Sequence, residues 1–296
     1  MSDPEIADST TVGRMLDELA AILRAGDVPH AFSEARDLIS CLYDVPRFWP
    51  MINAGVSVEP AVHERALRAA YKRTGGAPLA YAVGRASFRN LTLDVDDRVL
   101  IPRPETEHLV ELVLDETRRM TGGVVVDVGV GSGAIAISLA TEGKGRFAKV
   151  YATDISLDAV NVARGNAERL GAAVDVVHGS LLSPLRGITA NVVVSNPPYI
   201  ALGEASSLPA SVRDWEPALA LFSGADGMHA TAGLVQQAAD VLAPGGLLAL
   251  EIDVRRASLA AELVSREPRF HSIRIELDLT GRERFLLARR REGEGE

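Results

Sequence analysis

Apolar residues recur at helical spacing near the start of the chain. Between residues 10 and 74 they return at intervals of three and four positions, which is typical of the buried face of a helix. Short breaks at Gly26-Asp27 and Gly55 divide this stretch into three segments. Short amphipathic helices bury their apolar faces against one another, so the pattern predicts a helical bundle. We expect this bundle to form a separate N-terminal domain over residues 1–76.

The pattern changes from helical spacing to alternation in the next segment. Between residues 88 and 100 apolar and polar side chains alternate, and Asp96-Asp97 interrupts the alternation. Alternation is typical of a half-buried strand, and an acidic pair between two such runs is a turn signal. Residues 77–103 are therefore predicted to form a β-hairpin linker with its turn at Asp96-Asp97. Pro104 follows, and proline suits the first turn of a helix.

Strand-like and helix-like segments alternate over the rest of the chain, residues 104–296. Runs rich in valine, isoleucine and leucine predict strands at 124–128, 149–154, 174–177, 192–195 and 247–252. Amphipathic segments between them predict helices at 134–141, 157–170 and 231–242. Alternating βα units predict an α/β fold, in which helices cover both faces of a mostly parallel sheet. Two final strands, at 273–279 and 284–288, are expected to pair as an antiparallel hairpin.

Composition and charge narrow the class of protein. The chain has 296 residues, a formal net charge of −9 and a sequence pI of about 5.3, so it lacks the general basic character of a nucleic-acid-binding protein. Its single cysteine, Cys41, excludes an intrachain disulfide and fits a reducing compartment. The sequence shows no signal-peptide pattern and no apolar run of membrane-spanning length. We expect a cytoplasmic monomer with no membrane association and no direct nucleic-acid binding.

The tetrapeptide Asn196-Pro197-Pro198-Tyr199 is the most informative candidate site. It follows the buried run 192–195, so it lies where a parallel strand ends, and open α/β sheets bind ligands at that edge. Two consecutive prolines fix φ and leave no backbone donors, which makes the turn stiff. A stiff turn could present one amide, one carbonyl and one aromatic face to a planar substrate group. The plain alternative is a proline-rich turn that only ends a strand.

This turn could support chemistry at an amide nitrogen. Such a nitrogen is a poor nucleophile because its lone pair is delocalised. Acceptors on its two N–H groups would orient it and stabilise the positive charge that develops as it attacks. The Oδ1 atom of Asn196 and the carbonyl of Pro197 are candidates for these acceptors. The histidines lack the spacing of a metal site or a catalytic triad, so we expect no metal.

A glycine-rich loop, residues 127–133, lies between the first predicted strand of the sheet and the helix that follows. It reads Asp-Val-Gly-Val-Gly-Ser-Gly, and glycines allow a tight turn and close approach of the backbone to a ligand at a helix N-terminus. The spacing differs from the dinucleotide fingerprint and is more typical of S-adenosylmethionine (SAM) binding. Asp154 ends the next strand, where a carboxylate can accept both ribose hydroxyls; its alternative role is to cap the next helix.

Taken together, these motifs resemble the HemK/PrmC family, the protein-(glutamine-N5) methyltransferases that modify peptide chain release factors. The resemblance covers nearly the whole chain. It rests on segments 78–84, 100–107, 127–134, 194–200, 216–221 and 224–227. Segment 194–200 is the closest match, but its Asn-Pro-Pro-Tyr turn is shared with methyltransferases that act on DNA and RNA amino groups. Segment 100–107, Leu-Ile-Pro-Arg-Pro-Glu-Thr-Glu, makes the match specific.

The resemblance implies a fold and a reaction. The fold would be that of a class I SAM-dependent methyltransferase, Rossmann-like with a mostly parallel seven-stranded sheet, preceded by the helical bundle and the hairpin linker. The reaction would move a methyl group from SAM to the side-chain amide of the glutamine in the Gly-Gly-Gln motif of class I release factors. The N-terminal bundle would dock the release factor.

The resemblance also implies roles for individual residues. The cofactor would be bound by Asp127, Gly129, Val130, Gly131, Ser132, Gly133, Asp154, Leu181 and Asn196. The substrate amide would be held by Asn196, Pro197, Pro198 and Tyr199, of which Asn196, Pro197 and Tyr199 would be catalytic. Arg103 and Glu105 would shape the cofactor entrance, or would only serve the start of a helix.

Three positions depart from the family pattern. Val130 replaces a small polar residue, Ser180 replaces an acid, and Asp253 replaces a glycine. These changes bear on cofactor affinity and leave the reaction class unaffected. Trp215 lies in the long connection 201–230, where it is either a packed anchor or part of a substrate cover.

Two other functions fit parts of the pattern. An adenine amino-methyltransferase acting on DNA or RNA would share the Asn-Pro-Pro-Tyr turn, but the net charge of −9 and the absence of an obvious basic recognition domain oppose it. A SAM-binding protein without catalysis, or a nicotinamide-binding module, would share the glycine loop. The Gly-x-Gly-x-Gly spacing opposes the nicotinamide version.

Overall fold

The computed structural model describes residues 10–292, which form two compact units. The first unit comprises residues 10–86 together with Pro209–Trp215, and the second comprises Ser87–Leu208 together with residues 216–292. The boundary at Ala86 lies inside the segment 77–103 that the sequence predicts as a linker. Part of the long connection 201–230 belongs to the first unit, which the alternation of strands and helices does not indicate.

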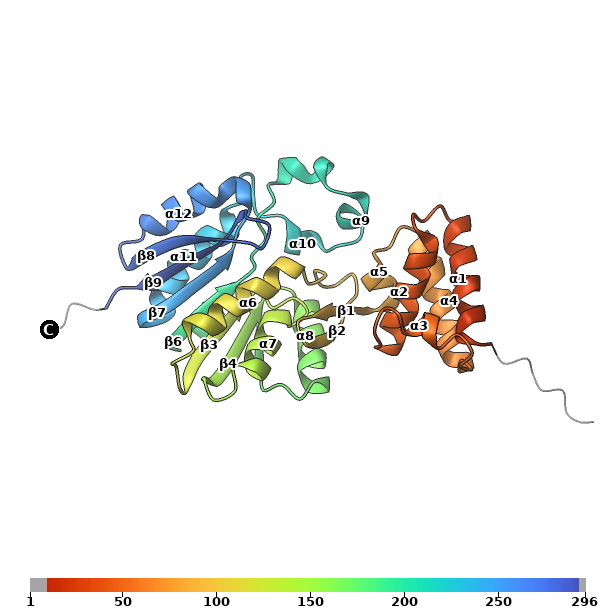
Figure 1. Ribbon diagram of the computed structural model, residues 1–296. Coiled ribbons are helices and arrows are strands. Elements are labelled where there is room, and N and C mark those ends of the chain that lie inside the picture. The colour runs from red at the N-terminus through yellow and green to blue at the C-terminus, as the bar shows by residue number, and fades with distance from the viewer. Residues whose placement is uncertain (1–9, 293–296) are drawn as a thin grey trace, which may run out of the picture. The chain divides into compact units, whose positions relative to one another are not determined.

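The first unit is helical (Figure 1). Its helices are α1 (Val12–Ala25), α2 (Ala31–Tyr43), α3 (Trp49–Ile52), α4 (Pro60–Thr74), α5 (Leu79–Val83) and α9 (Ala210–Arg213). Thr11 caps α1, since its hydroxyl accepts a hydrogen bond from the Arg14 amide at 3.4 Å. Met15, Leu19 and Leu38 are fully buried in one core between the helices. This core confirms the helical bundle expected from the apolar spacing.

The predicted hairpin is present, but its turn is displaced. Strands β1 (Arg85–Phe88) and β2 (Leu91–Asp94) pair, so the hairpin turn lies at Arg89-Asn90. A turn is also present at Asp96-Asp97, where the Val99 amide donates to the Asp96 carbonyl at 3.1 Å, but it follows the hairpin instead of joining its two strands. Arg89 adopts a φ of 50°, and its amide donates to Glu107 Oε1 at 3.0 Å. Its guanidinium also binds Glu142 at 2.7 Å. These long-range contacts hold the turn at Arg89, and no local sequence signal reveals them.

A seven-stranded sheet forms the centre of the second unit (Figure 1). Its strands are β3 (Gly123–Val128), β4 (Phe147–Asp154), β5 (Asp175–His178), β6 (Ala190–Ser195), β7 (Leu242–Glu251), β8 (Phe270–Leu277) and β9 (Glu283–Arg290). Their order is β5-β4-β3-β6-β7-β9-β8. Among strands β3 to β7 every neighbouring pair is parallel, whereas β9 is antiparallel to both β7 and β8. The mostly parallel sheet and the final antiparallel pair are thus confirmed.

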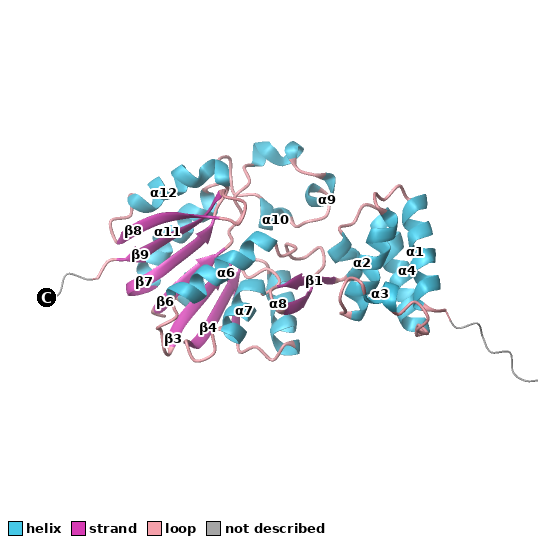
Figure 2. Ribbon diagram, viewed as in Figure 1, coloured by secondary structure: helices cyan, strands magenta, loops and turns pink. Residues whose placement is uncertain are grey.

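Helices cover both faces of this sheet (Figure 2). On one face lie α6 (Pro104–Glu116), α7 (Ala134–Glu142) and α8 (Leu157–Arg169), and on the other lie α11 (His229–Val241) and α12 (Ala257–Ser265). Each face of a strand presents every second side chain, so a strand between two helical layers is apolar on both sides. This two-sided burial explains why the strands read as continuous apolar runs.

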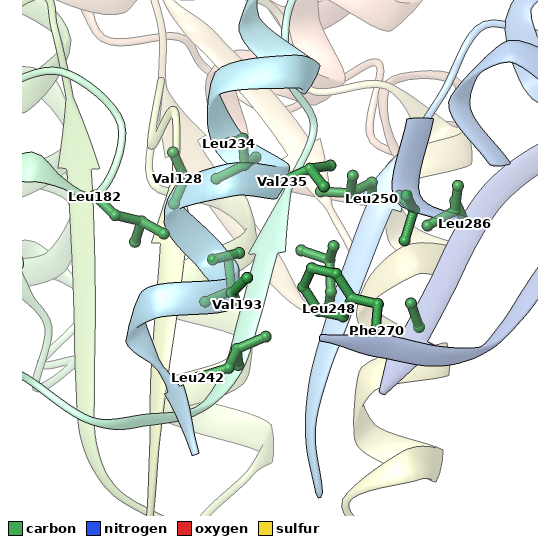
Figure 3. Packing of buried hydrophobic residues seen from close by; sticks show 14 of the residues in the cluster. Val128, Leu182, Val193, Leu234, Val235, Leu242, Leu248, Leu250, Phe270 and Leu286 are labelled. Atoms are coloured by element: carbon green, nitrogen blue, oxygen red, sulfur yellow. The ribbon is translucent and has the colours of Figure 1, made fainter. Parts of the chain in front are cut away.

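One apolar core fills the space between α11, α12 and the strands beneath them (Figure 3). Leu234 of α11 and Val193 of β6 are fully buried there, together with Leu248 and Leu250 of β7. Because successive side chains of a strand point to opposite faces, the odd-numbered positions of β7 face the layer of α6 instead. Glu251 is one of those positions, so the end of β7 places a carboxylate beside α6.

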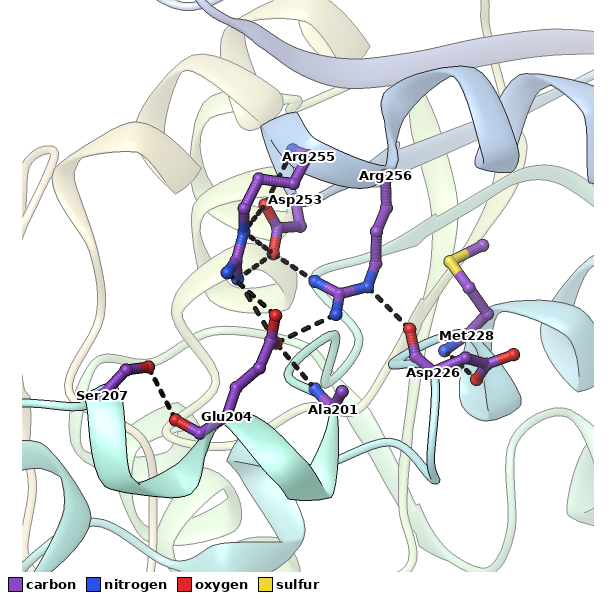
Figure 4. Close-up of polar contacts among 8 residues, drawn as sticks. All are labelled: Ala201, Glu204, Ser207, Asp226, Met228, Asp253, Arg255 and Arg256. Atoms are coloured by element: carbon purple, nitrogen blue, oxygen red, sulfur yellow. Dashed lines mark hydrogen bonds and ion pairs between the residues drawn. The ribbon is translucent and has the colours of Figure 1, made fainter.

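The long connection after β6 is ordered by short helices and by a polar cluster (Figure 4). It contains η2 (Leu202–Ser207), α9 and α10 (Ala218–Leu221). Glu204 of η2 binds Arg255 and Arg256 of η3 (Val254–Arg256), each at 2.9 Å. Arg256 also donates to the Asp226 carbonyl at 2.6 Å. Both ends of the connection are therefore fixed to the segment that follows β7.

Asp253, which stands where the family pattern has glycine, belongs to the same cluster (Figure 4). Its carboxylate accepts a hydrogen bond from the Arg255 amide at 2.9 Å and pairs with Arg255 and Arg256, each at 2.6 Å. Burial raises the pKa of Asp253, but these hydrogen bonds and the two guanidinium charges lower it overall. This departure therefore serves to anchor the connection.

Candidate active site

Two candidate motifs leave the sheet at the same edge. The strand order reverses between β3 and β6, which are adjacent and parallel, and their register pairs Val128 with Ser195. Ser195 is fully buried, and its hydroxyl donates to the Val128 carbonyl at 2.6 Å. Ligands of open α/β sheets bind at such a reversal point. The glycine loop after β3 and the Asn196 turn after β6 therefore border one site.

The glycine loop is an open backbone cradle at the N-terminus of α7. Its glycines lie in the left-handed region, with φ of 80° at Gly129, 51° at Gly131 and 91° at Gly133. No atom stands within 4 Å of a Cβ added at Gly129 or Gly131, so this side of the loop is free to approach a ligand. A Cβ at Gly133 would meet Ile137 of the same helix at 2.7 Å, so glycine there leaves room for the Ile137 side chain.

The side chains between these glycines are buried. Val130 is 4% exposed and Ser132 is 3% exposed, so both residues are almost fully buried. Valine at position 130 therefore packs into the protein, and this departure from the family pattern leaves the open side of the loop unchanged.

Asp127 supports the loop from the end of β3. Its Oδ2 accepts a hydrogen bond from the Ala136 amide in the first turn of α7 at 3.0 Å. Its Oδ1 is buried and has no partner among the described residues. Burial raises the pKa of Asp127 to about 8, although the Ala136 hydrogen bond opposes the shift. A buried acceptor without a partner, next to open glycines, suits a ligand that brings a hydrogen-bond donor or a positive charge.

Asp154 joins the end of β4 to the same loop. Its Oδ2 accepts from the Gly131 amide at 3.0 Å, and its Oδ1 accepts from the Ser156 amide at 2.9 Å. Ser156 itself caps α8 through the Ala159 amide at 3.2 Å, so the cap position is filled. Each carboxylate oxygen of Asp154 retains a lone pair for a further donor. The ribose contact remains a prediction that this geometry allows.

Leu181 follows β5 with a φ of 48°. Its carbonyl accepts from the Thr153 hydroxyl at 2.7 Å, and its side chain packs against the core beside α11. A Cβ at Gly233 of α11 would meet the Leu181 Cδ1 atom at 2.9 Å. The side chain is thus engaged in packing, and its contact with adenine remains a prediction.

The Asn196 side chain is held at one end. Its Nδ2 donates to the Thr106 hydroxyl of α6 at 3.0 Å, and Thr106 in turn donates to Glu251 Oε2 at 2.7 Å. Among the described residues Asn196 Oδ1 accepts no hydrogen bond. Sequence reasoning did not single out Thr106 or Glu251. The available signal for Glu251 was a lone acid at the end of the apolar run 247–250.

Burial keeps the aromatic side chain of this turn neutral. Burial raises the pKa of Tyr199 to about 12, and the nearby Glu251 carboxylate adds to the shift. Burial also raises the pKa of Glu251 to about 7, against the opposing effects of the Thr106 hydrogen bond and Arg284. Pro197 is buried, whereas Asn196 and Tyr199 are partly exposed. Tyr199 can therefore offer an uncharged ring to a substrate.

Arg103 holds a buried acid from the long connection. Its guanidinium lies 2.6 Å from Glu216 Oε1, and the Glu216 side chain is 1% exposed. The second oxygen of Glu216 has no partner among the described residues. The two residues come from segments 100–107 and 216–221 of the motif set, so the structure joins motifs that are far apart in the sequence.

Within residues 10–292 no group of histidine, cysteine, aspartate and glutamate side chains could hold a metal ion. No helix of the described part is long and apolar enough to cross a membrane.

Comparison with known proteins gives the family. Residues 105–210 match the model of the methyltransferase small domain. The chain is 40% identical to the release factor glutamine methyltransferase of Deinococcus radiodurans, over 93% of this chain and 96% of that one. It is also 40% identical to the enzyme of that name from Moorella thermoacetica, over 95% of this chain and 99% of that one. The chain belongs to the release factor glutamine methyltransferase family.

Solved structures agree with the fold of a release factor glutamine methyltransferase. The hMettl16 catalytic domain superposes with a TM-score of 0.53 at 16% identity, over 79% of this chain and 82% of that one. A methyltransferase from Pyrococcus furiosus gives a TM-score of 0.50 at 21% identity, over 77% of this chain and 98% of that one. The class I methyltransferase fold is confirmed, and the named relatives do not favour an adenine amino-methyltransferase.

A release factor glutamine methyltransferase uses SAM, and the residues of the β3 edge fit that cofactor. The open glycines at 129 and 131 admit a ligand close to the backbone. The unpartnered Oδ1 of Asp127 offers a buried acceptor to a cationic group, and Asp154 offers acceptors at the end of the next strand.

Proposed function

We propose that this protein methylates the side-chain amide nitrogen of the glutamine in the Gly-Gly-Gln motif of class I release factors. The observation that carries the proposal is the Asn196 amide at the β3/β6 reversal point. Its Nδ2 is engaged by Thr106, which leaves Oδ1 as the end that can accept from a substrate. An amide-accepting turn beside a SAM-type glycine loop is what transfer to an amide nitrogen requires.

The cofactor site is assigned to four strand ends, those of β3, β4, β5 and β6. The backbone of residues 129–133 would hold the methionine part, with Asp127 as an acceptor for its ammonium group, and Asp154 would accept the ribose hydroxyls. Leu181 and Asn196 complete the proposed set. When bound, SAM supplies an electrophilic methyl group on a positively charged sulfur.

The substrate site is assigned to the turn after β6. Asn196 Oδ1 and the Pro197 carbonyl would each accept one N–H of the substrate amide, which orients its nitrogen and stabilises the positive charge developing there. Tyr199 would pack its neutral ring against the amide plane, and the consecutive prolines at 197 and 198 keep these acceptors in place. Positioning accounts for much of the rate, and the methylated nitrogen releases its proton without a dedicated base.

The first unit is proposed to dock the release factor. Its short helix α3 and the residue before it expose large apolar side chains: Phe48 is 65% exposed, Met51 50% and Ile52 81%. Exposed apolar side chains that gather in one segment mark interaction surfaces. A protein partner, rather than nucleic acid, also fits the net charge of −9. A translation factor as substrate places the enzyme in the cytoplasm, where we expect it to act as a monomer.

Methyl transfer from labelled SAM to a purified release factor tests the proposal. The release factor with Gln→Ala in its Gly-Gly-Gln motif is the matched control. Label in the wild-type factor alone is the expected result. Label in DNA or RNA, with none in the release factor, would replace the proposal with the nucleic-acid alternative.

A further inference from the structure

We propose that Glu251 acts through Thr106 as a positioning residue that sets which end of the Asn196 amide faces the substrate. The inference rests on the proposed function, because it explains how the acceptor end of Asn196 is presented to a glutamine amide. Neither Thr106 nor Glu251 contacts the reacting atoms in this assignment.

The three side chains form one chain of hydrogen bonds across three elements. Asn196 comes from the turn after β6, Thr106 from the first turns of α6, and Glu251 from the end of β7. The Asn196 Nδ2 to Thr106 Oγ1 distance is 3.0 Å, and the Thr106 Oγ1 to Glu251 Oε2 distance is 2.7 Å. Glu251 is 1% exposed and Thr106 is 5% exposed, so water does not compete for these bonds.

The direction of this chain of hydrogen bonds follows from the single proton of the Thr106 hydroxyl. An ionised carboxylate only accepts hydrogen bonds, so Glu251 takes the proton of the Thr106 hydroxyl. That hydroxyl can then only accept from Asn196, which must present Nδ2 to it. The flipped amide would place Asn196 Oδ1 against the Thr106 oxygen with no hydrogen between them. An ionised Glu251 therefore leaves Asn196 Oδ1 as the end directed toward the substrate.

The charge on Glu251 controls this direction. A protonated Glu251 can donate to Thr106, which frees the Thr106 proton for Asn196 Oδ1 and allows the amide to flip. Burial raises the pKa of Glu251 to about 7, so the carboxyl changes its charge near neutral pH. The ionised form, and with it the productive amide orientation, prevails above that pH.

Other charged and titratable groups face Glu251 from the elements around it. Arg103 and Glu105 lie at the start of α6, Tyr199 in the turn after β6, and Arg284 on β9. His108 of α6 packs on Phe285, the residue that pairs with Glu251 across β7 and β9, with ring centroids 5.2 Å apart. A pH profile must therefore be compared with that of a Glu251 variant to separate Glu251 from His108.

Substitution of Thr106 tests this chain of hydrogen bonds. Thr106→Val keeps the shape of the side chain and removes its hydroxyl, so kcat should fall on the order of 10²-fold with little change in the KM of the release factor. Thr106→Ser restores the hydroxyl and should restore kcat to within about threefold of wild type. Thr117→Val is the control, since Thr117 is a buried threonine near the end of the same helix and donates only within that helix.

Three outcomes of this series would overturn the inference. They are an unchanged kcat in Thr106→Val, an equal loss in Thr106→Ser, and an equal loss in Thr117→Val. SAM affinity and the melting temperature of every variant must accompany the rates, because a loss of either would indicate a general structural defect. A wild-type enzyme that leaves the release factor unmethylated would contradict the proposed function and would not bear on the hydrogen-bond chain.

A pH titration tests this chain of hydrogen bonds directly, by kcat with substrate and by NMR without it. In wild type, kcat at saturating SAM should rise with pH through about 7, and the NMR signals of the Asn196 side-chain NH2 should shift over the same range. Glu251→Gln should lower kcat about tenfold or more, because its amide permits both directions of the chain, and should abolish both titrations. Asn196 signals that titrate equally in Glu251→Gln, or that do not titrate in wild type, would overturn the inference.

Discussion

The side-chain nitrogen of Asn196 is held by a hydrogen bond, whereas its side-chain oxygen remains available as an acceptor. The difference arises from one hydrogen bond of 3.0 Å, from Asn196 Nδ2 to Thr106 Oγ1, and the Thr106 hydroxyl in turn donates to Glu251. Asp154 is arranged differently, since both of its oxygens already bind backbone amides of the loops they border. This difference agrees with the proposed roles, in which Asn196 acts on the substrate and Asp154 shapes the cofactor site.

Asn196→Ala should separate catalysis from cofactor binding. Loss of the Asn196 side chain removes an acceptor for the substrate amide, so kcat should fall on the order of 10²- to 10³-fold. The SAM dissociation constant, measured by calorimetry, should stay within about threefold of wild type, because the glycine loop binds through its backbone. A parallel collapse of SAM affinity would mean that Asn196 acts mainly on the cofactor and would contradict its role as an acceptor for the substrate amide.

Asp154→Ala should give the opposite pattern. It removes acceptors for the ribose and for the Gly131 amide, so the SAM dissociation constant should rise about tenfold or more. Once SAM is saturating, kcat should recover most of its wild-type value. Asp158→Ala, an exposed aspartate in the first turn of α8, is the matched control and should leave SAM binding unchanged.

At the scale of elements, the sequence predicts the regular parts of the fold and misses what depends on distant contacts. The strands of the sheet follow from their apolar runs, because burial on both faces demands them. Helix α12 is not predicted, although its buried residues Ala257, Ala260 and Val264 recur at helical spacing. Two of the three are small alanines, and packing in the core beside α11 fixes the helix. The hairpin turn is misplaced because distant acids bind Arg89.

The same limit applies to the candidate site. The glycine loop and the Asn196 turn are local motifs, so their positions at strand ends can be predicted from the chain. The pairing of Asn196 with Thr106, and of Thr106 with Glu251, requires β7 to lie beside β6 and α6 to cover that face. No local pattern specifies this arrangement.

The anchoring of the long connection is a prediction at this scale. Glu204→Gln removes the charge that binds Arg255 and Arg256, so the free energy of unfolding should fall by about 1 kcal/mol. Limited proteolysis should cut within 201–230 faster than in wild type. Glu262→Gln is the control, because its pair with Arg266 is exposed and should contribute less than about 0.5 kcal/mol. Equal proteolysis of the two variants would contradict an anchoring role.

At the scale of the whole molecule, the two units suggest a division of labour. The second unit carries the SAM-type loop and the Asn196 turn, whereas the first unit exposes the apolar side chains around α3. A release factor is far larger than the amide that is methylated, so affinity for it can be supplied away from the site of chemistry.

The combined substitution of Phe48→Ser and Ile52→Ser tests this division. The KM for an intact release factor should rise about tenfold, because two apolar contacts are lost on binding. SAM affinity and kcat should stay near wild type. Tyr71→Ser is the control, since Tyr71 is 63% exposed on α4 of the same unit. A KM that changes equally in both variants, or in neither, would place docking elsewhere.

The position of β7 in the sheet determines when, during synthesis of the chain, the Asn196 amide can be oriented. Chain segments around residues 106, 196 and 251 must meet before the Asn196 amide is oriented, and the last of them ends a strand that pairs beside β6. A ribosome makes these segments in sequence, so a nascent chain that stops before β7 can complete the glycine loop but cannot align the amide. The Asn196 amide thus reaches its oriented state only after β7 has been synthesised and has paired beside β6.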